Sequence, residues 1–199
     1  MAQVRCTRCT LRRGRRDDAP LLAELVNYAG EGLSLYSWNK VAGPEETGWD
    51  VGRRSAAREE GSISYRNATI IEHNGNAAGC LIGRGIGSSP TAIPSDMPAM
   101  FVPLQELENL ALDTWYVNVL AIRPQFRRAG LGTRLLAHAD DIASGRGHRG
   151  LSVVVSDANL GARRLYERCG YKEAALRAMV KEAWVNEGQN WVLLMKAVG

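Results

Sequence analysis

A strand, a short loop and a helix follow one another within residues 115–139, and no other stretch restricts the fold of this chain as strongly. Residues 115–122 are rich in β-branched and aromatic side chains, with one polar interruption at Asn118, which is typical of a largely buried strand. Pro124 ends the strand because proline has no N–H to donate. The leucines and alanines of residues 131–139 have the spacing of an amphipathic helix.

The loop between this strand and this helix has the composition of an anion-binding site. First-turn amides of a helix lack intrahelical partners and carry the positive end of the helix dipole, so they suit a pyrophosphate. Gly130 and Gly132 allow a close approach to the backbone, and Arg127 and Arg128 supply positive charge. The loop has neither the Gly-Lys-Ser/Thr of a Walker loop nor the Gly-x-Gly-x-x-Gly of a dinucleotide fold.

A second block downstream adds specificity to the pattern Arg127-x-x-Gly130-x-Gly132. It reads Asn159-x-x-Ala162-x-x-Leu165-Tyr166-Glu167-x-x-Gly170-Tyr171. Together the two blocks resemble the GNAT superfamily of acyl-CoA-dependent N-acetyltransferases, most closely over residues 115–171. The resemblance implies an α/β fold with a mixed, mostly antiparallel sheet of about seven strands and helices on both faces. Residues 85–100 are rich in Gly, Ser and Pro without periodicity, and no domain boundary is visible, so we expect a single N-acetyltransferase domain over residues 1–199 with an insertion at about 85–113.

The same resemblance implies where the co-substrate, acetyl-CoA, binds. The central strand would offer main-chain groups to the pantetheine arm, the loop would enclose the pyrophosphate, and Asn159 would hydrogen-bond the arm, although asparagine is also a good helix N-cap. The family often has glycine or a basic residue where Ala129 stands, and a cradle of backbone amides tolerates that change. The residues implied are Leu120, Ala121 and Ile122 on the strand and Arg127, Arg128, Ala129, Gly130, Leu131, Gly132 and Thr133 in the loop and helix.

Tyr166 matches the family's tyrosine near the thioester sulfur, where the leaving thiolate needs a proton donor. The attacking amine must be neutral, so a general base is also expected. Relatives often place an acid on the strand before Asn159, but residues 151–156 contain none. The remaining candidates for the base are Glu106, Glu108, Asp113 and Glu31, and Asn118 could hold a water in place of a base.

The acceptor pocket is expected to involve the loop between the first two helices, which usually faces the substrate in this superfamily. Tyr36, Trp38 and Tyr116 could line such a pocket or belong to the core. With Glu31 and Asn118, they are the candidate substrate residues.

Local signals predict the remaining elements. Asp17 or Asp18 followed by Pro20 is typical of a helix start, and Asn74-Gly75 indicates a hairpin with a type I′ turn. A helix begins at Asn159 and has Gly170 as its C′ residue. We expect strands at 7–13, 68–72, 77–84, 151–156, 174–181 and 190–196, helical segments at 44–60 and 102–112, and a loop at 33–38.

Charge and cysteine content limit the class of protein. The net charge is +4, and of 25 basic residues only Lys40, Lys172, Lys181 and Lys196 are lysines, which favours anionic ligands without requiring nucleic acid. No apolar run approaches the length of a membrane span, and we expect a cytoplasmic, reducing setting with no membrane partner. Cys6-x-x-Cys9 has no second ligand pair at a suitable spacing, so no metal site is expected. A homodimer is a further expectation from the superfamily.

These observations predict an N-acetyltransferase that transfers the acetyl group of acetyl-CoA to a primary amine of a small molecule, protein or peptide by direct attack. Cys169 does not fit as a nucleophile, because no histidine partner lies at a recognisable spacing. A non-catalytic acyl-CoA-binding sensor or regulatory module is the alternative that the missing base favours. A third hypothesis, an acyltransferase acting on charged tRNA, rests on the arginine excess and predicts RNA affinity that falls steeply with salt.

Overall fold

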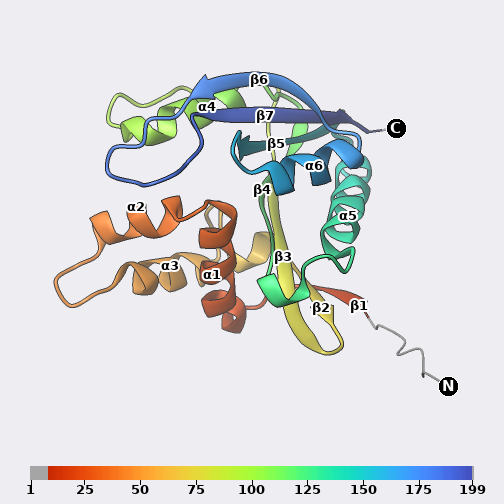
Figure 1. Ribbon diagram of the computed structural model, residues 1–199, viewed down its shortest axis with the longest axis horizontal. Helices are drawn as coiled ribbons and strands as arrows, with labels where there is room; N and C mark the ends of the chain where they lie inside the picture. The colour runs from red at the N-terminus through yellow and green to blue at the C-terminus, as the bar shows by residue number, and fades with distance from the viewer. Residues whose placement is uncertain (1–8, 199) are drawn as a thin grey trace. The chain divides into compact units, whose positions relative to one another are not determined.

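The computed structural model describes residues 9–198 (Figure 1). The strands are β1 (Cys9–Arg13), β2 (Ala68–His73), β3 (Asn76–Gly85), β4 (Thr114–Ile122), β5 (Gly150–Ser156), β6 (Lys172–Ala178) and β7 (Asn190–Ala197). The α-helices are α1 (Ala19–Ala29), α2 (Leu33–Val41), α3 (Gly48–Ala56), α4 (Val102–Glu108), α5 (Leu131–Gly145) and α6 (Leu160–Arg168), and short 3-10 turns occupy Arg16–Asp18, Tyr65–Asn67, Ala99–Phe101 and Pro124–Phe126.

The strands form one seven-stranded sheet in the order β1-β2-β3-β4-β5-β7-β6. β4 and β5 are parallel, whereas β1 and β2, β2 and β3, β5 and β7, and β6 and β7 are antiparallel pairs. The predicted mixed, mostly antiparallel sheet is therefore confirmed. Among the residues described, no helix combines the length and apolar character that a membrane span requires.

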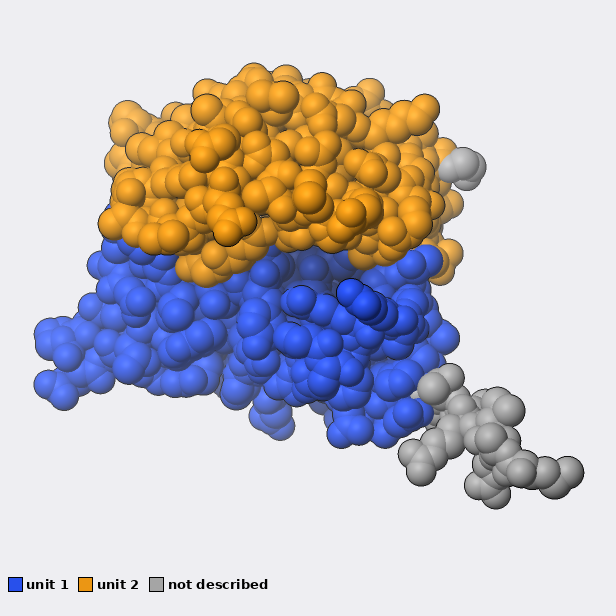
Figure 2. Space-filling model, viewed as in Figure 1, with its two compact units in different colours: residues 1–30, 34–82, 119–135 blue, residues 31–33, 83–118, 136–199 orange. Residues whose placement is uncertain are grey.

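Two compact units divide the described chain, as Figure 2 shows. Of the described residues, unit 1 comprises 9–30, 34–82 and 119–135, and unit 2 comprises 31–33, 83–118 and 136–198. Each unit therefore combines segments that are far apart in the sequence.

The core of unit 1 joins helix α1 to the hairpin strands β2 and β3. Leu22 and Leu25 of α1 and Ile70 and Ile82 of the strands are completely buried. In the hairpin, Asn74 has φ +52° and Gly75 has φ +80°, and positive φ at both central residues defines the predicted type I′ turn. The hairpin prediction is confirmed.

One loop prediction is wrong, and one predicted helix is shorter than expected. The aromatic segment 33–38, expected as a loop, lies in helix α2, where Trp38 belongs to the core cluster and Leu35 packs against it. The predicted helix 44–60 shrinks to α3 (Gly48–Ala56), which Thr47 begins with a capping box to Asp50.

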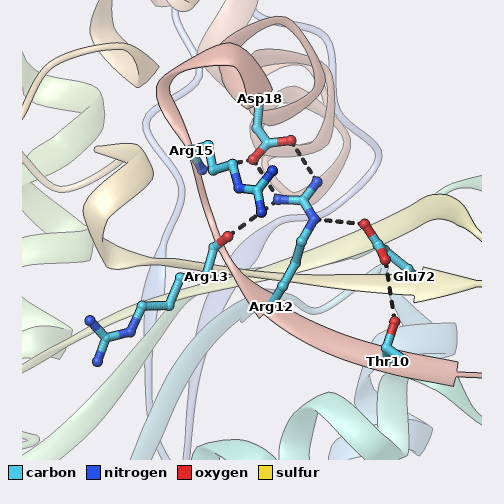
Figure 3. A network of polar contacts seen from close by, with 6 residues as sticks. All are labelled: Thr10, Arg12, Arg13, Arg15, Asp18 and Glu72. Atoms are coloured by element: carbon cyan, nitrogen blue, oxygen red, sulfur yellow. Dashed lines mark hydrogen bonds and ion pairs between the residues drawn. The ribbon is translucent and has the colours of Figure 1, made fainter.

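Asp18 is the N-cap residue of α1, but its carboxylate makes no cap hydrogen bond. It belongs to a polar network instead, in which Arg12 lies between Asp18 and Glu72 (Figure 3). Arg12 donates to Asp18 at 2.7 and 2.8 Å and to Glu72 at 2.6 Å. These hydrogen bonds lower the pKa of both carboxyl groups, against the opposing effect of burial. The network thus ties β1 to β2 and to the start of α1.

We expect Arg12→Met to lower the free energy of unfolding by about 1–2 kcal/mol at pH 7. The pKa values of Asp18 and Glu72 are lower in the native state than in the unfolded chain, where they are about 3.9 and 4.3. The stabilisation is therefore complete above these unfolded-state values and is lost as pH falls through the native-state values. The difference between wild type and variant should therefore shrink below about pH 4. Thermal unfolding of wild type and Arg12→Met at several pH values measures this difference. Arg13→Met is the control, because the Arg13 side chain points away from the network in Figure 3. Equal destabilisation by both variants would contradict it.

Unit 2 is organised by β5 and β7, which pair along the whole length of β5 from Gly150 to Ser156. The segment 85–113 contains α4. After this helix, the Asn109 side chain makes two 2.9 Å hydrogen bonds to the main chain of Thr91, in the earlier part of the segment. Helix α6 ends in a Schellman motif: Tyr171 N–H donates to the Tyr166 carbonyl and Gly170 N–H to the Glu167 carbonyl, both at 3.0 Å. Gly170 has φ +91°, so its predicted role as C′ residue is confirmed.

Candidate active site

The predicted phosphate loop lies in unit 1, directly before helix α5. Residues Arg127, Arg128, Ala129 and Gly130 are exposed, and α5 continues for 15 residues from Leu131. Arg128 and Gly130 have φ values of +63° and +74°, which turn the chain sharply into the helix. A Cβ on Gly130 would meet open space, so the backbone conformation, and not crowding, favours glycine there. The solvent-exposed first turn of a long helix, next to two arginines, fits a pyrophosphate group.

The strand that leads into this loop is β4. Within unit 1, Arg123 N–H donates to the Ala78 carbonyl at 2.8 Å, and the Ala121 carbonyl lies close to Gly79. Within unit 2, the parallel register of β4 with β5 runs from Thr114 and Gly150 to Tyr116 and Ser152. The predicted cofactor residues Leu120, Ala121 and Ile122 thus lie on the last part of β4.

Helix α6 carries the two predicted site residues of the second block. Asn159 is its N-cap: Oδ1 accepts from Ala162 N–H at 3.1 Å, and Nδ2 donates to Glu31 Oε1 at 2.5 Å. The N-cap interpretation is therefore correct, and the contact with the cofactor stays a prediction. Tyr166 is buried, and its ring packs edge-on against Tyr171 with centroids 5.4 Å apart.

Burial raises the pKa of Tyr166 above the usual value of a phenol. Its hydroxyl is therefore protonated at neutral pH, as a hydrogen-bond donor must be.

The two candidate bases on α4 lie in different surroundings. Glu106 pairs with Arg177 at 2.8 Å, and both side chains are 41% exposed. Glu108 is only 15% exposed; it pairs with Arg84 and lies against the Tyr116 hydroxyl. Burial raises the pKa of Glu108, and the hydrogen bonds and charges of Arg84 and Tyr116 oppose this shift without cancelling it. Glu108 therefore has the environment of a tuned base, whereas Glu106 has that of a surface ion pair.

Tyr116 makes a side-chain hydrogen bond with Glu108 and interacts electrostatically with Tyr166. Burial and the Glu108 carboxylate raise the pKa of Tyr116, and Tyr166 adds to this shift. The guanidinium carbon of Arg84 lies 5.6 Å from the centre of the Tyr116 ring. We call Arg84, Glu108, Tyr116 and Tyr166 the polar cluster of unit 2. The sequence contained no signal for Arg84, and it left Tyr116 open between pocket and core.

The candidate substrate residues are divided between the units. In unit 1, Trp38 packs edge-on to Trp49 with centroids 6.3 Å apart and against Gly52, whereas Tyr36 lies under the Lys40 ammonium at 4.9 Å. In unit 2, Asn118 is half-buried on β4, and Glu31 accepts hydrogen bonds from Asn159 and Asn186. Trp38 is a core residue of unit 1, and the acceptor contacts stay predictions.

No group of three histidine, cysteine or acidic residues suited to a metal occurs within residues 9–198. The Cys6-x-x-Cys9 pair lies partly outside the described residues, because Cys6 precedes them.

Comparison with known proteins identifies the family. The model of the acetyltransferase (GNAT) family matches residues 33–171. Ribosomal protein bS18-alanine N-acetyltransferase of Salmonella typhimurium is 37% identical over 71 residues, which are 36% of this chain and 48% of that enzyme. The match thus spans about half the length of that curated relative.

Solved structures share the fold. One acetyltransferase has a TM-score of 0.64 at 23% identity, covering 96% of this chain and 100% of its own. N-acetylglutamate synthase from Neisseria gonorrhoeae, complexed with coenzyme A and N-acetyl-glutamate, has a TM-score of 0.55 at 18% identity, covering 96% of this chain and 35% of its own. The chain therefore belongs to the acetyltransferase (GNAT) family, as its two sequence blocks predicted, and the co-substrate of that family is acetyl-CoA.

Proposed function

We propose that this chain is an N-acetyltransferase that transfers the acetyl group of acetyl-CoA to a primary amine by direct attack. The polar cluster of unit 2 is the observation that carries the proposal, because it combines a protonated phenol with a largely buried carboxylate of raised pKa that pairs with Arg84. The family match, over residues 33–171, includes segments of both units. It supports a single catalytic domain with the segment 85–113 as an insertion.

The co-substrate supplies the acetyl group as a thioester. In unit 1, the exposed loop and first helical turn, residues 127–133, bind the pyrophosphate through backbone amides and the two arginines. The main chain of Leu120, Ala121 and Ile122 pairs with the pantetheine arm. In unit 2, Asn159 keeps one amide hydrogen and one lone pair beyond the bonds it already makes, and these serve the arm.

Tyr166 stabilises the departing sulfur. As the amine nitrogen forms its bond to the carbonyl carbon, the C–S bond breaks and negative charge develops on sulfur. A thiol has a pKa near 8.5, below the raised pKa of Tyr166, so the phenol cannot protonate sulfur completely before the bond breaks. Its role is to donate a hydrogen bond as the charge develops. The released thiolate then takes a proton from solvent to give the free CoA thiol, and Tyr166 keeps its own proton.

Glu108 takes the proton that the acceptor nitrogen loses. Its raised pKa moves it toward the pH of the reaction, where a base is most effective. The Tyr116 hydroxyl, in contact with Glu108, can carry this proton from the nitrogen side to the carboxylate. This arrangement compensates for the missing acid on strand β5.

The acceptor is an amine of a small molecule, protein or peptide. The relative named for bS18-alanine N-acetylation supports a protein amine as the first acceptor class to test. A cytoplasmic setting, a homodimer and the absence of nucleic-acid and membrane partners stay predictions.

Thermal melting with acetyl-CoA, free CoA and NAD tests the cofactor loop. A ligand that binds only the native state at 100 times its Kd adds about 2.7 kcal/mol of stability, or roughly 5–10 °C in a chain of this size. We expect this shift with acetyl-CoA and CoA but not with NAD. No shift at millimolar acetyl-CoA would contradict the proposal, and a shift without turnover of any amine would indicate a non-catalytic acyl-CoA-binding module.

A further inference from the structure

Glu31 lies at a turn that the chain holds in an unfavourable conformation. Its φ is +52° although it carries a side chain, and this left-handed region is unfavourable for most residues other than glycine. The carbonyl of Glu31 accepts from Trp184 Nε1–H at 3.2 Å. Trp184 in turn stacks on Trp191 of β7, with centroids 5.8 Å apart and planes 8° from parallel. Surrounding contacts within unit 2 therefore determine the position of Glu31.

The Glu31 carboxylate joins two other segments of unit 2. Oε1 accepts from Asn159 Nδ2 at 2.5 Å and Oε2 from Asn186 Nδ2 at 2.6 Å. Both amides are oriented by a second bond, since Asn159 Oδ1 accepts from Ala162 N–H and Asn186 Oδ1 from Gly188 N–H at 2.7 Å. One carboxylate thus fixes the N-cap of α6 and the loop between β6 and β7.

We infer that Glu31 is a positioning residue, and not the base, and that it couples the β6–β7 loop to the helix that carries Tyr166. This inference rests on the proposed function for its catalytic consequence. Tyr166 follows Asn159 by seven residues, two helical turns, so it lies on the same side of α6 as the cap. A shift of Asn159, the N-cap residue, moves the Tyr166 hydroxyl with the helix. A shift of Asn186 changes which groups the β6–β7 loop can contact. The Glu31 carboxylate, which bridges Asn159 and Asn186, therefore keeps the Tyr166 hydroxyl and the β6–β7 loop in one arrangement.

Glu31→Gln tests the bridge directly. Glutamine has one oxygen where glutamate has two, so one of the two asparagine amides must face an N–H group and lose its bond. We expect kcat/KM for the acceptor to fall about tenfold or more, while the acid limb of the pH profile keeps its midpoint. Loss of that limb would identify Glu31 as the base and overturn the inference.

Asn186→Ala removes only the loop half of the bridge. We expect it to raise KM for the acceptor while leaving kcat within about twofold, whereas Glu31→Gln changes both. Glu187→Gln is the matched control, because it makes the same chemical change on an exposed side chain of the same loop. Equal effects of Glu31→Gln and Glu187→Gln would contradict the inference.

Amide hydrogen exchange gives a readout that needs no turnover. Glu31→Gln should speed exchange of the Ala162 amide, whose acceptor is the Asn159 side chain, and of the Gly188 amide, and Glu187→Gln should affect neither. If wild type acetylates no amine but these exchange rates still change, the proposed function fails and the bridge stands. Unchanged exchange in Glu31→Gln would overturn the bridge whatever the activity.

Discussion

Tyr166→Phe should lower kcat by about 100-fold or more, because the loss of one hydrogen-bond donor to charge that develops in the transition state costs about 10²–10³ in rate. The substitution removes only the hydroxyl group and keeps the buried aromatic ring. The edge-on packing of the ring against Tyr171 remains. KM for acetyl-CoA should therefore change little, and the melting temperature should stay within a degree or two.

Tyr171→Phe is the matched control for that variant. The Tyr171 hydroxyl is buried without a hydrogen-bond partner in the described structure, so its removal should be neutral or slightly stabilising. Steady-state kinetics at saturating acetyl-CoA, with free thiol measured as product, compares the two variants. If Tyr166→Phe kept kcat within about threefold of wild type, the sulfur would be stabilised by another donor and the assignment would be wrong.

Local chemistry accounts for the parts of the fold that the sequence predicted. A proline after an apolar run ends β4, Asn74-Gly75 fits only a tight turn with positive φ, and Gly170 ends α6. These signals act within a few residues. The segment Leu33–Val41 lacks such a signal, and it is helical because tertiary packing buries Leu33 and Trp38.

The same distinction applies to the site. The phosphate loop is a continuous segment, so its pattern is visible in the sequence. Glu106 and Glu108 stand two residues apart on one short helix, and their sequence surroundings do not separate them. Arg84 and Tyr116, far from them along the chain, give Glu108 its buried environment. The difference between the two carboxylates thus depends on tertiary contacts, as does the position of Glu31 between two asparagines.

Glu108→Gln should lower kcat/KM for the acceptor by about 10²–10³ at neutral pH, since glutamine cannot accept the proton. Burial raises the pKa of Glu108, and a protonated carboxyl cannot act as a base. In wild type, kcat/KM should therefore fall as pH drops through a midpoint above the ordinary glutamate value of about 4.3.

That acid limb should be absent in Glu108→Gln and present in Glu106→Gln, the same change on the same helix at a side chain paired with Arg177. Arg84 is 41% exposed, so it stays solvated when the Glu108 charge is removed, and the fold should persist. A limb that arises from the acceptor's own amine would remain in both variants. If the acid limb persisted in Glu108→Gln and kcat/KM were unchanged, water alone would take the proton. Glu108 would then have only a structural role in unit 2.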